Sequence, residues 1–118
     1  MKHQCGKKKL NLRSSHRKAL LRNQAIHLVK FGSLKTTKTR VKAVQQFVEK
    51  IVTIARKGSD FNTIRRVKQL LPYDNNATKK LILEIAPKYT ERPGGYTRVI
   101  PLGKRLSDTA TIARLEWV

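Results

Sequence analysis

The chain of 118 residues is strongly basic, with 27 Lys and Arg against 7 Asp and Glu, a formal net charge of +20 and a pI near 11.0. This length suits one domain, and the charge indicates a polyanionic partner, because a compact domain with such an excess repels itself. The sequence has no apolar run of the roughly eighteen residues that a membrane span needs, and Cys5 has no second cysteine with which to form a disulfide.

The N-terminal segment is predicted to be a basic arm followed by a helix. Residues 1–13 lack apolar periodicity, so we expect an extended arm that becomes ordered on its partner. Ser14 or Ser15 is predicted to cap the helix, because a serine hydroxyl can accept from a free backbone N–H there, and Gly32 is predicted to end it. The inward side of this helix consists of Leu21, Ala25, Leu28 and Val29.

Residues 33–37 are predicted to be a short extended connection to the clearest helix of the chain. A continuous apolar stripe defines that second helix, and Gly58 is predicted to end it. The stripe consists of Val41, Val44, Val48, Ile51, Val52 and Ala55.

Two shorter helices are predicted next. Pro72 is expected to stop the third helix, and Pro87 the fourth, which Asn75 or Asn76 is expected to cap. The inward residues of these helices are Phe61, Ile64, Val67 and Leu71 in the third, and Ala77, Leu81 and Ile85 in the fourth.

The apolar period then changes to two, which is typical of strands. Residues 97–102 and 109–118 are predicted strands, and the loop 103–108 suits a hairpin. Pro101 indicates that the first of these strands lies at an edge or carries a bulge. One face of the last strand is predicted to hold Ala113, Leu115 and Trp117.

The positive charge is concentrated in the first half of the chain. Residues 1–58 hold sixteen basic residues and one acidic residue, Glu49, whereas residues 59–118 hold eleven and six. A surface designed for solubility mixes both signs, so this distribution favours contact with nucleic acid. The N-terminus lacks the apolar core of a signal peptide. We therefore expect a cytoplasmic protein that engages neither a membrane nor a small-molecule substrate.

Residues for catalysis or metal binding do not form a recognisable pattern. A zinc site needs four ligands in short paired spacings, but Cys5 is a lone thiol and His3, His16 and His27 are dispersed. Ser15 and His16 are adjacent, so they point in different directions on a helix, and no acid stands nearby to orient the histidine. We therefore expect no metal, no cofactor and no enzymatic activity.

The segment 92–98, Arg-Pro-Gly-Gly-Tyr-Thr-Arg, is a candidate contact with RNA. Two consecutive glycines allow a positive φ and a close backbone approach to another surface, and Tyr96 offers a flat face to a base or sugar. The alternative is an ordinary turn with Tyr96 packed on the core, and both readings remain open. Seven aromatic residues are few for a protein that reads bases by stacking. Recognition through phosphates and RNA shape is the expected mode.

Several segments together resemble a known family. The chain is similar to the bacterial large-subunit ribosomal protein numbered seventeen, and the resemblance covers essentially its whole length. The segments that carry it are Met1-Lys2-His3, Leu10-Asn11, the run from Ser14 to Asn23, Lys35-Thr36-Thr37, the run from Arg92 to Arg98, and the ending from Ala113 to Val118. The chain departs from the family pattern at Gly6, which sits one residue early, and at Leu12, where a basic residue is usual.

The resemblance implies a two-layer α/β domain with a short strand at 33–37. With the helices and strands above, it predicts an α+β fold: residues 14–118 as a single domain, about four helices on a small mixed sheet of about three strands. It also implies a seat on large-subunit ribosomal RNA near the polypeptide exit tunnel, beside the ribosomal proteins numbered twenty-two and thirty-two. An organellar ribosome remains possible beside a cytoplasmic one.

The resemblance also implies a set of RNA-binding residues. Those at positions that match the family pattern are Lys2, His3, Asn11, Ser14, Ser15, His16, Arg17, Arg22, Asn23, Lys35, Thr36, Thr37, Arg92, Gly94, Gly95, Tyr96, Thr97 and Arg98. The neighbouring basic residues that we add are Lys7, Lys8, Lys9, Arg13, Lys38, Arg40, Lys104 and Arg105. The main alternative is a nucleoid-like protein that binds DNA or RNA generally, although a helix-turn-helix or dimer arm would be usual there. A small RNA-processing enzyme is the other, but it would need a clustered acid–base set.

Overall fold

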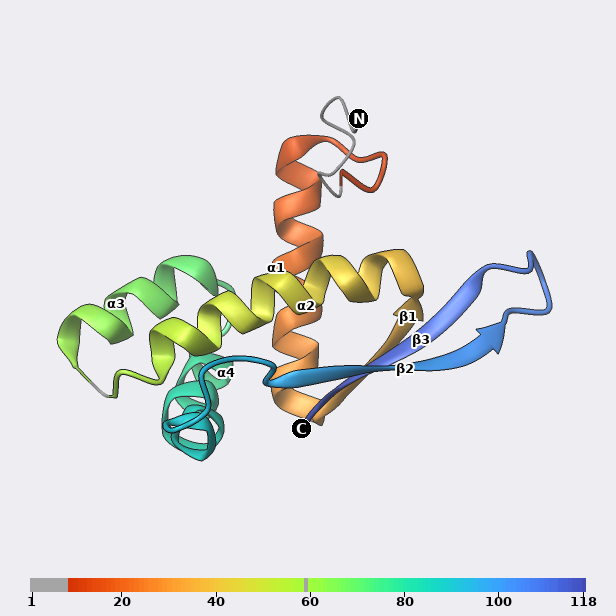
Figure 1. Cartoon of the computed structure of the whole chain (residues 1–118). Coiled ribbons are helices and arrows are strands. Elements are labelled where there is room, and N and C mark those ends of the chain that lie inside the picture. Colours follow the sequence, from red (N-terminus) through yellow and green to blue (C-terminus); the bar gives the residue numbers. More distant parts are fainter. Residues whose placement is uncertain (1–8, 59) are drawn as a thin grey trace, which may run out of the picture.

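The computed structural model describes residues 9–58 and 60–118, and the first eight residues of the predicted arm lie outside these ranges. Four α-helices and a three-stranded sheet make up the described part (Figure 1). This arrangement confirms the expected α+β fold.

The first helix, α1 (Ser14–Phe31), has the predicted extent but not the predicted cap. Arg13 is its N-cap and makes no side-chain cap hydrogen bond, while Ser14 and Ser15 are already helical, so the expected serine cap is wrong. Gly32 ends the helix as predicted, because its φ of 80° allows its N–H to bond the Leu28 carbonyl at 2.9 Å. The fully buried residues of α1 all lie in its second half, and the first half projects from the body (Figure 1).

The second helix, α2 (Lys38–Ala55), forms the centre of the core. All six residues of the predicted stripe are at most 1 % exposed. The helix ends at Ala55, slightly before Gly58, whose φ of 110° lets the chain turn towards the next helix. The apolar period thus predicted both the helix and its buried face correctly.

The helix α3 (Phe61–Leu70) follows the prediction in extent, with one difference on its inward side. Val67 is fully buried and Leu71 is buried just beyond the helix, as expected. Phe61 is instead 74 % exposed, and the Arg65 guanidinium lies 5.9 Å from its ring centre. Its position in the first turn places the ring beyond the edge of the core.

The helix α4 (Asn75–Lys80) continues into a π-helical segment, η1 (Leu81–Ile85), and a 3-10 turn, η2 (Ala86–Tyr89). The predicted Asn75 or Asn76 cap is wrong. Asp74 caps the helix, and its Oδ1 accepts from the N–H groups of Asn76 and Ala77 at 2.9 and 3.1 Å. The helical path continues past Pro87 into η2. Pro87 occupies the first turn of this 3-10 helix, where a proline disrupts no hydrogen bond.

The sheet consists of β1 (Ser33–Thr37), β2 (Thr97–Lys104) and β3 (Thr111–Trp117), in the order β1-β3-β2. Both pairings are antiparallel, which corrects the expected mixed sheet, since β3 runs against both of its neighbours. The strand β1 confirms the element that the resemblance implied. A register shift between Pro101 and Gly103 confirms the predicted bulge, and β2 is an edge strand as expected.

The helical layer packs on one face of this sheet. Ala113 and Leu115 of β3 are fully buried against the helices, and Trp117 packs beside them, as the alternating pattern predicted. Arg114 and Glu116 alternate with these residues and therefore lie on the opposite face. No helix in the described ranges is both long enough and apolar enough to span a membrane.

Candidate nucleic-acid interface

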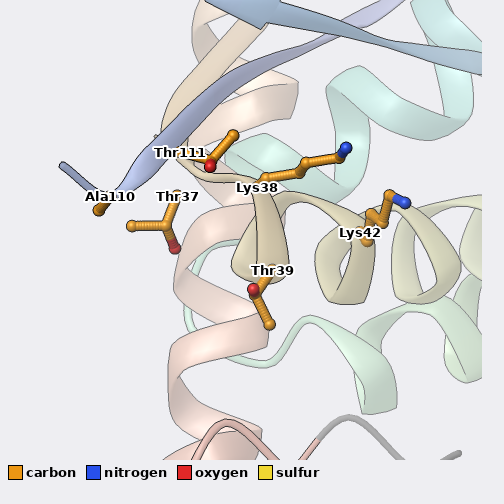
Figure 2. Close-up of a pocket in the computed structure, with 6 residues that line it drawn as sticks. All are labelled: Thr37, Lys38, Thr39, Lys42, Ala110 and Thr111. Carbon is orange, nitrogen blue, oxygen red and sulfur yellow. The ribbon is translucent and has the colours of Figure 1, made fainter. Parts of the chain in front are cut away.

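An open hollow of about 570 Å³ lies where β1 passes into α2 (Figure 2). Its lining includes no carboxylate and consists of Thr37, Lys38, Thr39, Lys42, Ala110 and Thr111. Figure 2 shows the three threonine side chains around the start of the helix, with the amines of both lysines reaching out beside it. The hollow therefore presents hydroxyl groups and positive charge.

The start of α2 adds to this positive character. Thr37 is the N-cap, but its side chain makes no cap hydrogen bond, and the first turn contains no acidic residue. The first N–H groups of a helix lack partners within it, and the helix dipole places partial positive charge at that end. Such a helix start binds phosphate readily.

A second hollow, of about 400 Å³, involves the preceding residues of β1. It is lined by Lys35, Thr36, Arg105 and Ile112, again without a carboxylate. The two hollows together take in four consecutive predicted RNA-binding residues, Lys35 to Lys38. The predicted residue Arg40 is also exposed, in the first turn of α2.

The projecting half of α1 presents a second group of predicted residues. Ser14, Ser15, His16 and Asn23 are exposed, whereas Arg17 and Arg22 are half-buried. The Arg22 guanidinium lies 5.7 Å from the Tyr73 ring centre, a cation–π distance that limits its motion. No acidic residue stands in the first turn of α1, so this half of the helix is also cationic.

Tyr96 does not present its ring to a partner, which corrects the RNA-binding expectation for this side chain. It is fully buried, with its ring centre 5.3 Å from that of Tyr89, and its hydroxyl accepts from Arg56 Nη1 at 3.0 Å. Thr97 is also buried, and its N–H and hydroxyl donate to Glu49 Oε1 at 3.3 and 3.0 Å. The alternative prediction, an ordinary turn with Tyr96 packed on the core, is therefore correct for Tyr96, and Thr97 is buried with it.

Glu49 of α2 and Arg56, the C-cap of that helix, hold this turn in place. Neither residue was predicted to do so. Besides the Tyr96 hydroxyl, Arg56 Nη1 donates to the Arg92 carbonyl at 2.7 Å. Glu49 anchors the start of β2 through Thr97. One signal was present in the sequence, since Glu49 is the single carboxylate of residues 1–58.

The remaining predicted residues of the turn lie at the surface. Gly95 has the expected positive φ, 63°, and exposed Arg92 donates from Nε to the Gly94 carbonyl at 3.2 Å. The Arg98 side chain is 61 % exposed, but its Nε pairs with Glu116 Oε1 at 2.7 Å. An anion that binds Arg98 must therefore compete with this carboxylate.

The predicted residues do not form one continuous patch. Lys104 and Arg105 lie beside the two hollows, whereas Arg98 and the glycine turn lie at the other end of β2. An eight-residue antiparallel strand is about 25 Å long, so the contacts fall on two separate sides. Lys9, Asn11 and Arg13 are exposed just before α1, and Lys2, His3, Lys7 and Lys8 lie outside the described residues.

The described residues contain no cluster of metal-ligating side chains. Among residues 9–58 and 60–118, no three His, Cys, Asp or Glu side chains come together in a way that could hold a metal ion. The His27 ring packs against Phe31 with 4.7 Å between ring centres. The surface features described above are cationic and hydroxyl-bearing, which suits binding to phosphates.

Comparison with known proteins gives consistent matches along the chain. The family model described as ribosomal protein L17 matches residues 20–118. The large ribosomal subunit protein bL17 of Wolinella succinogenes is 47 % identical over 118 residues, which is the whole of both chains. The protein of the same name from Campylobacter jejuni is 48 % identical over the whole of this chain and 99 % of the relative. That of Helicobacter acinonychis is 45 % identical over both complete chains.

Proposed function

Since the chain belongs to the ribosomal protein L17 family, which consists of structural ribosomal proteins and not of enzymes, we propose that it binds large-subunit ribosomal RNA through phosphate and shape contacts. The bound surface comprises the basic arm, the projecting half of α1, the junction of β1 with α2, and the exposed arginines around the glycine turn. Residues 14–118 act as one RNA-binding domain, and residues 1–13 act as its arm.

The junction of β1 with α2 is the observation that carries this proposal. Hydroxyls, lysine amines and the start of an eighteen-residue helix converge there without a carboxylate in either hollow. An RNA phosphate needs donors and positive charge, and this junction supplies both from a rigid element. Lys35 and Lys38 provide charge on either side of the threonine N-cap.

The glycine turn contributes differently from the hollows. Its interior residues Tyr96 and Thr97 are fixed to α2, so the turn is a rigid mount rather than an adaptable loop. Arg92 and Arg98 are the exposed cations on this mount, and each reaches phosphate by exchanging its internal partner. The position of Gly95 allows the backbone itself to approach RNA closely.

The family resemblance supports a more specific location. We place the protein near the polypeptide exit tunnel of a bacterial-type large subunit, in contact with the ribosomal proteins numbered twenty-two and thirty-two. Site-specific cross-linking in purified large subunits tests these neighbours. Cross-links to other proteins alone would contradict this placement.

A paired-variant binding experiment tests the RNA contact itself. Lys35→Ala/Lys38→Ala is compared with Lys68→Ala/Lys79→Ala, which removes the same charge from exposed positions on α3 and α4. Filter binding to purified large-subunit RNA over a range of salt should give the parent protein a log–log slope above about three. The first variant should lower that slope by about 1.5, since each phosphate contact contributes about 0.7 to 0.9.

The control variant should retain most of the parental slope. Equal losses in both variants would show that total charge, not the junction, determines binding. A parental slope near one would contradict a multiphosphate interface. Equal affinity for double-stranded DNA of the same length would favour the nucleoid-like alternative instead.

A further inference from the structure

The hairpin of β2 and β3 carries an unusually exposed leucine at its tip. Leu106 is 102 % exposed, whereas Leu102 on the same hairpin is 43 % exposed. Figure 1 shows the hairpin extending away from the helices. No part of the described chain covers the Leu106 side chain, so its apolar surface is available to a partner.

The tip that carries Leu106 is braced internally. Arg105 Nε and Nη2 donate to the two carboxylate oxygens of Asp108 at 2.9 and 2.6 Å. The Arg105 N–H donates to the Ala110 carbonyl, and the Thr109 N–H to the Arg105 carbonyl, both at 2.8 Å. Asp108 Oδ1 also accepts from the Ala110 N–H at 3.2 Å. These bonds close the loop independently of any partner.

The internal hydrogen bonds of the tip make binding of a partner by Leu106 more favourable than it would be if the loop were mobile. Isolated apolar residues are common on protein surfaces and usually need no explanation. In a mobile loop, however, binding would be opposed by the entropy of ordering the segment, and the bracing of this tip removes most of that opposition. Leu106 is thus presented in a defined position, which is the arrangement expected of an inserting side chain.

The charge around the tip identifies the kind of partner. Arg105 lines the hollow with Lys35, and Ala110 lines the hollow with Lys38 and Lys42. Asp108, the acidic residue of the tip, is neutralised by its pair with Arg105. The residues that flank the tip therefore belong to the surface proposed to bind phosphates, which favours RNA over a protein as the neighbour of Leu106.

We propose that the hairpin tip inserts Leu106 against the face of an unstacked base in a loop or bulge of ribosomal RNA. This inference rests on the proposed function and assigns to that RNA an apolar contact besides its phosphate contacts. Nucleic-acid-binding proteins use leucine as an apolar wedge at base steps, and the bases of RNA loops are free to be splayed out. Arg105 then acts mainly as a brace for the tip.

Substitutions that change the chemistry of the tip without touching its brace provide the test. Leu106→Ser should weaken binding to purified large-subunit RNA by about ten- to hundredfold, the loss expected for an unburied leucine. The salt dependence should stay unchanged, because no phosphate contact is lost. Leu106→Phe should keep near-parental affinity, and Leu106→Lys should weaken binding although it adds a positive charge.

Matched changes at Leu102 serve as controls. Leu102→Ser and Leu102→Lys alter the same hairpin away from its tip, and thermal melts confirm that every variant is folded. Parental affinity of Leu106→Ser, or tighter binding of Leu106→Lys, would overturn the insertion. If the unsubstituted protein itself fails to bind the RNA, the proposed function fails first, so the two failures are distinguishable.

A photoreactive leucine analogue separates RNA from protein as the partner. Placed at position 106 in assembled large subunits, it should cross-link to RNA at bases that dimethyl sulfate probing shows to be unpaired. The same analogue at position 102 should give little of this product. A cross-link from position 106 to a protein would show that the tip is a protein contact and would overturn the proposal.

Discussion

Removal of the Glu49 carboxylate should destabilise the fold although the residue lies on the rim of the core. Glu49 Oε1 accepts both from the N–H and from the hydroxyl of Thr97, which is 6 % exposed. Each buried donor left without an acceptor costs about 1–3 kcal/mol. Glu49 itself is half-buried, so water replaces part of the loss. We expect Glu49→Ala to lower the free energy of unfolding by about 2–3 kcal/mol.

Two companion variants separate the hydrogen bonds from the charge. Glu49→Gln keeps an acceptor oxygen and should cost less than about 1 kcal/mol. Glu84→Ala removes an equal charge from an exposed position and should change stability by less than about 0.5 kcal/mol.

Urea unfolding gives the free energies directly, and thermal melts should show about 3–6 °C per kcal/mol for a domain of this size. The reasoning is refuted if Glu49→Ala is as stable as Glu84→Ala. It is also refuted if Glu49→Gln is as unstable as Glu49→Ala, because the acceptor would then not matter.

Three further perturbations address the turn and the hairpin. Gly95→Val should cost about 1–3 kcal/mol through backbone strain alone, since a Cβ there meets no atom within 4 Å; a melt as high as the parent's would contradict this. Arg98→Ala should cost less than about 1 kcal/mol of stability, because the Arg98 side chain is largely exposed in its pair with Glu116, yet filter binding should show weaker RNA affinity. Hydrogen bonding to Arg105 lowers the pKa of Asp108 to about 2, so this pair's contribution is complete above the ordinary carboxylate pKa of about 4 and is lost as the pH falls through about 2. The Arg105 Nε–H resonance should therefore stay constant from neutral pH to about 4, and a shift within that range would contradict the pairing.

The helices were predictable because the apolar pattern that indicates each helix lies within the helix itself. The stripe of α2 repeats at helical spacing, so the same residues that indicate the helix also define its buried face. The caps were less predictable, because several polar residues compete within a few positions. Asp74 caps α4 in place of the neighbouring asparagines, and its pair with Lys30, from the end of α1, favours its ionised form.

The interior of the glycine turn was not predictable from its own residues. Whether Tyr96 faces RNA or the core depends on Arg56, which lies 40 positions away in sequence and comes close only in the folded chain. The hollow at α2 has the same character, since Thr37 and Lys38 meet Ala110 and Thr111 through the pairing of β1 with β3. Local patterns cannot specify such contacts.

The bulge in β2 has a consequence for the protein before it meets its partner. An open sheet edge tends to recruit strands from other copies of the same chain and so to start aggregation. On the β2 edge, Pro101 lacks an N–H, the register shift breaks the hydrogen-bonding row, and Lys104 adds charge. The other edge, β1, is only five residues long and carries exposed Lys35. These features disfavour edge-to-edge pairing between copies of the chain.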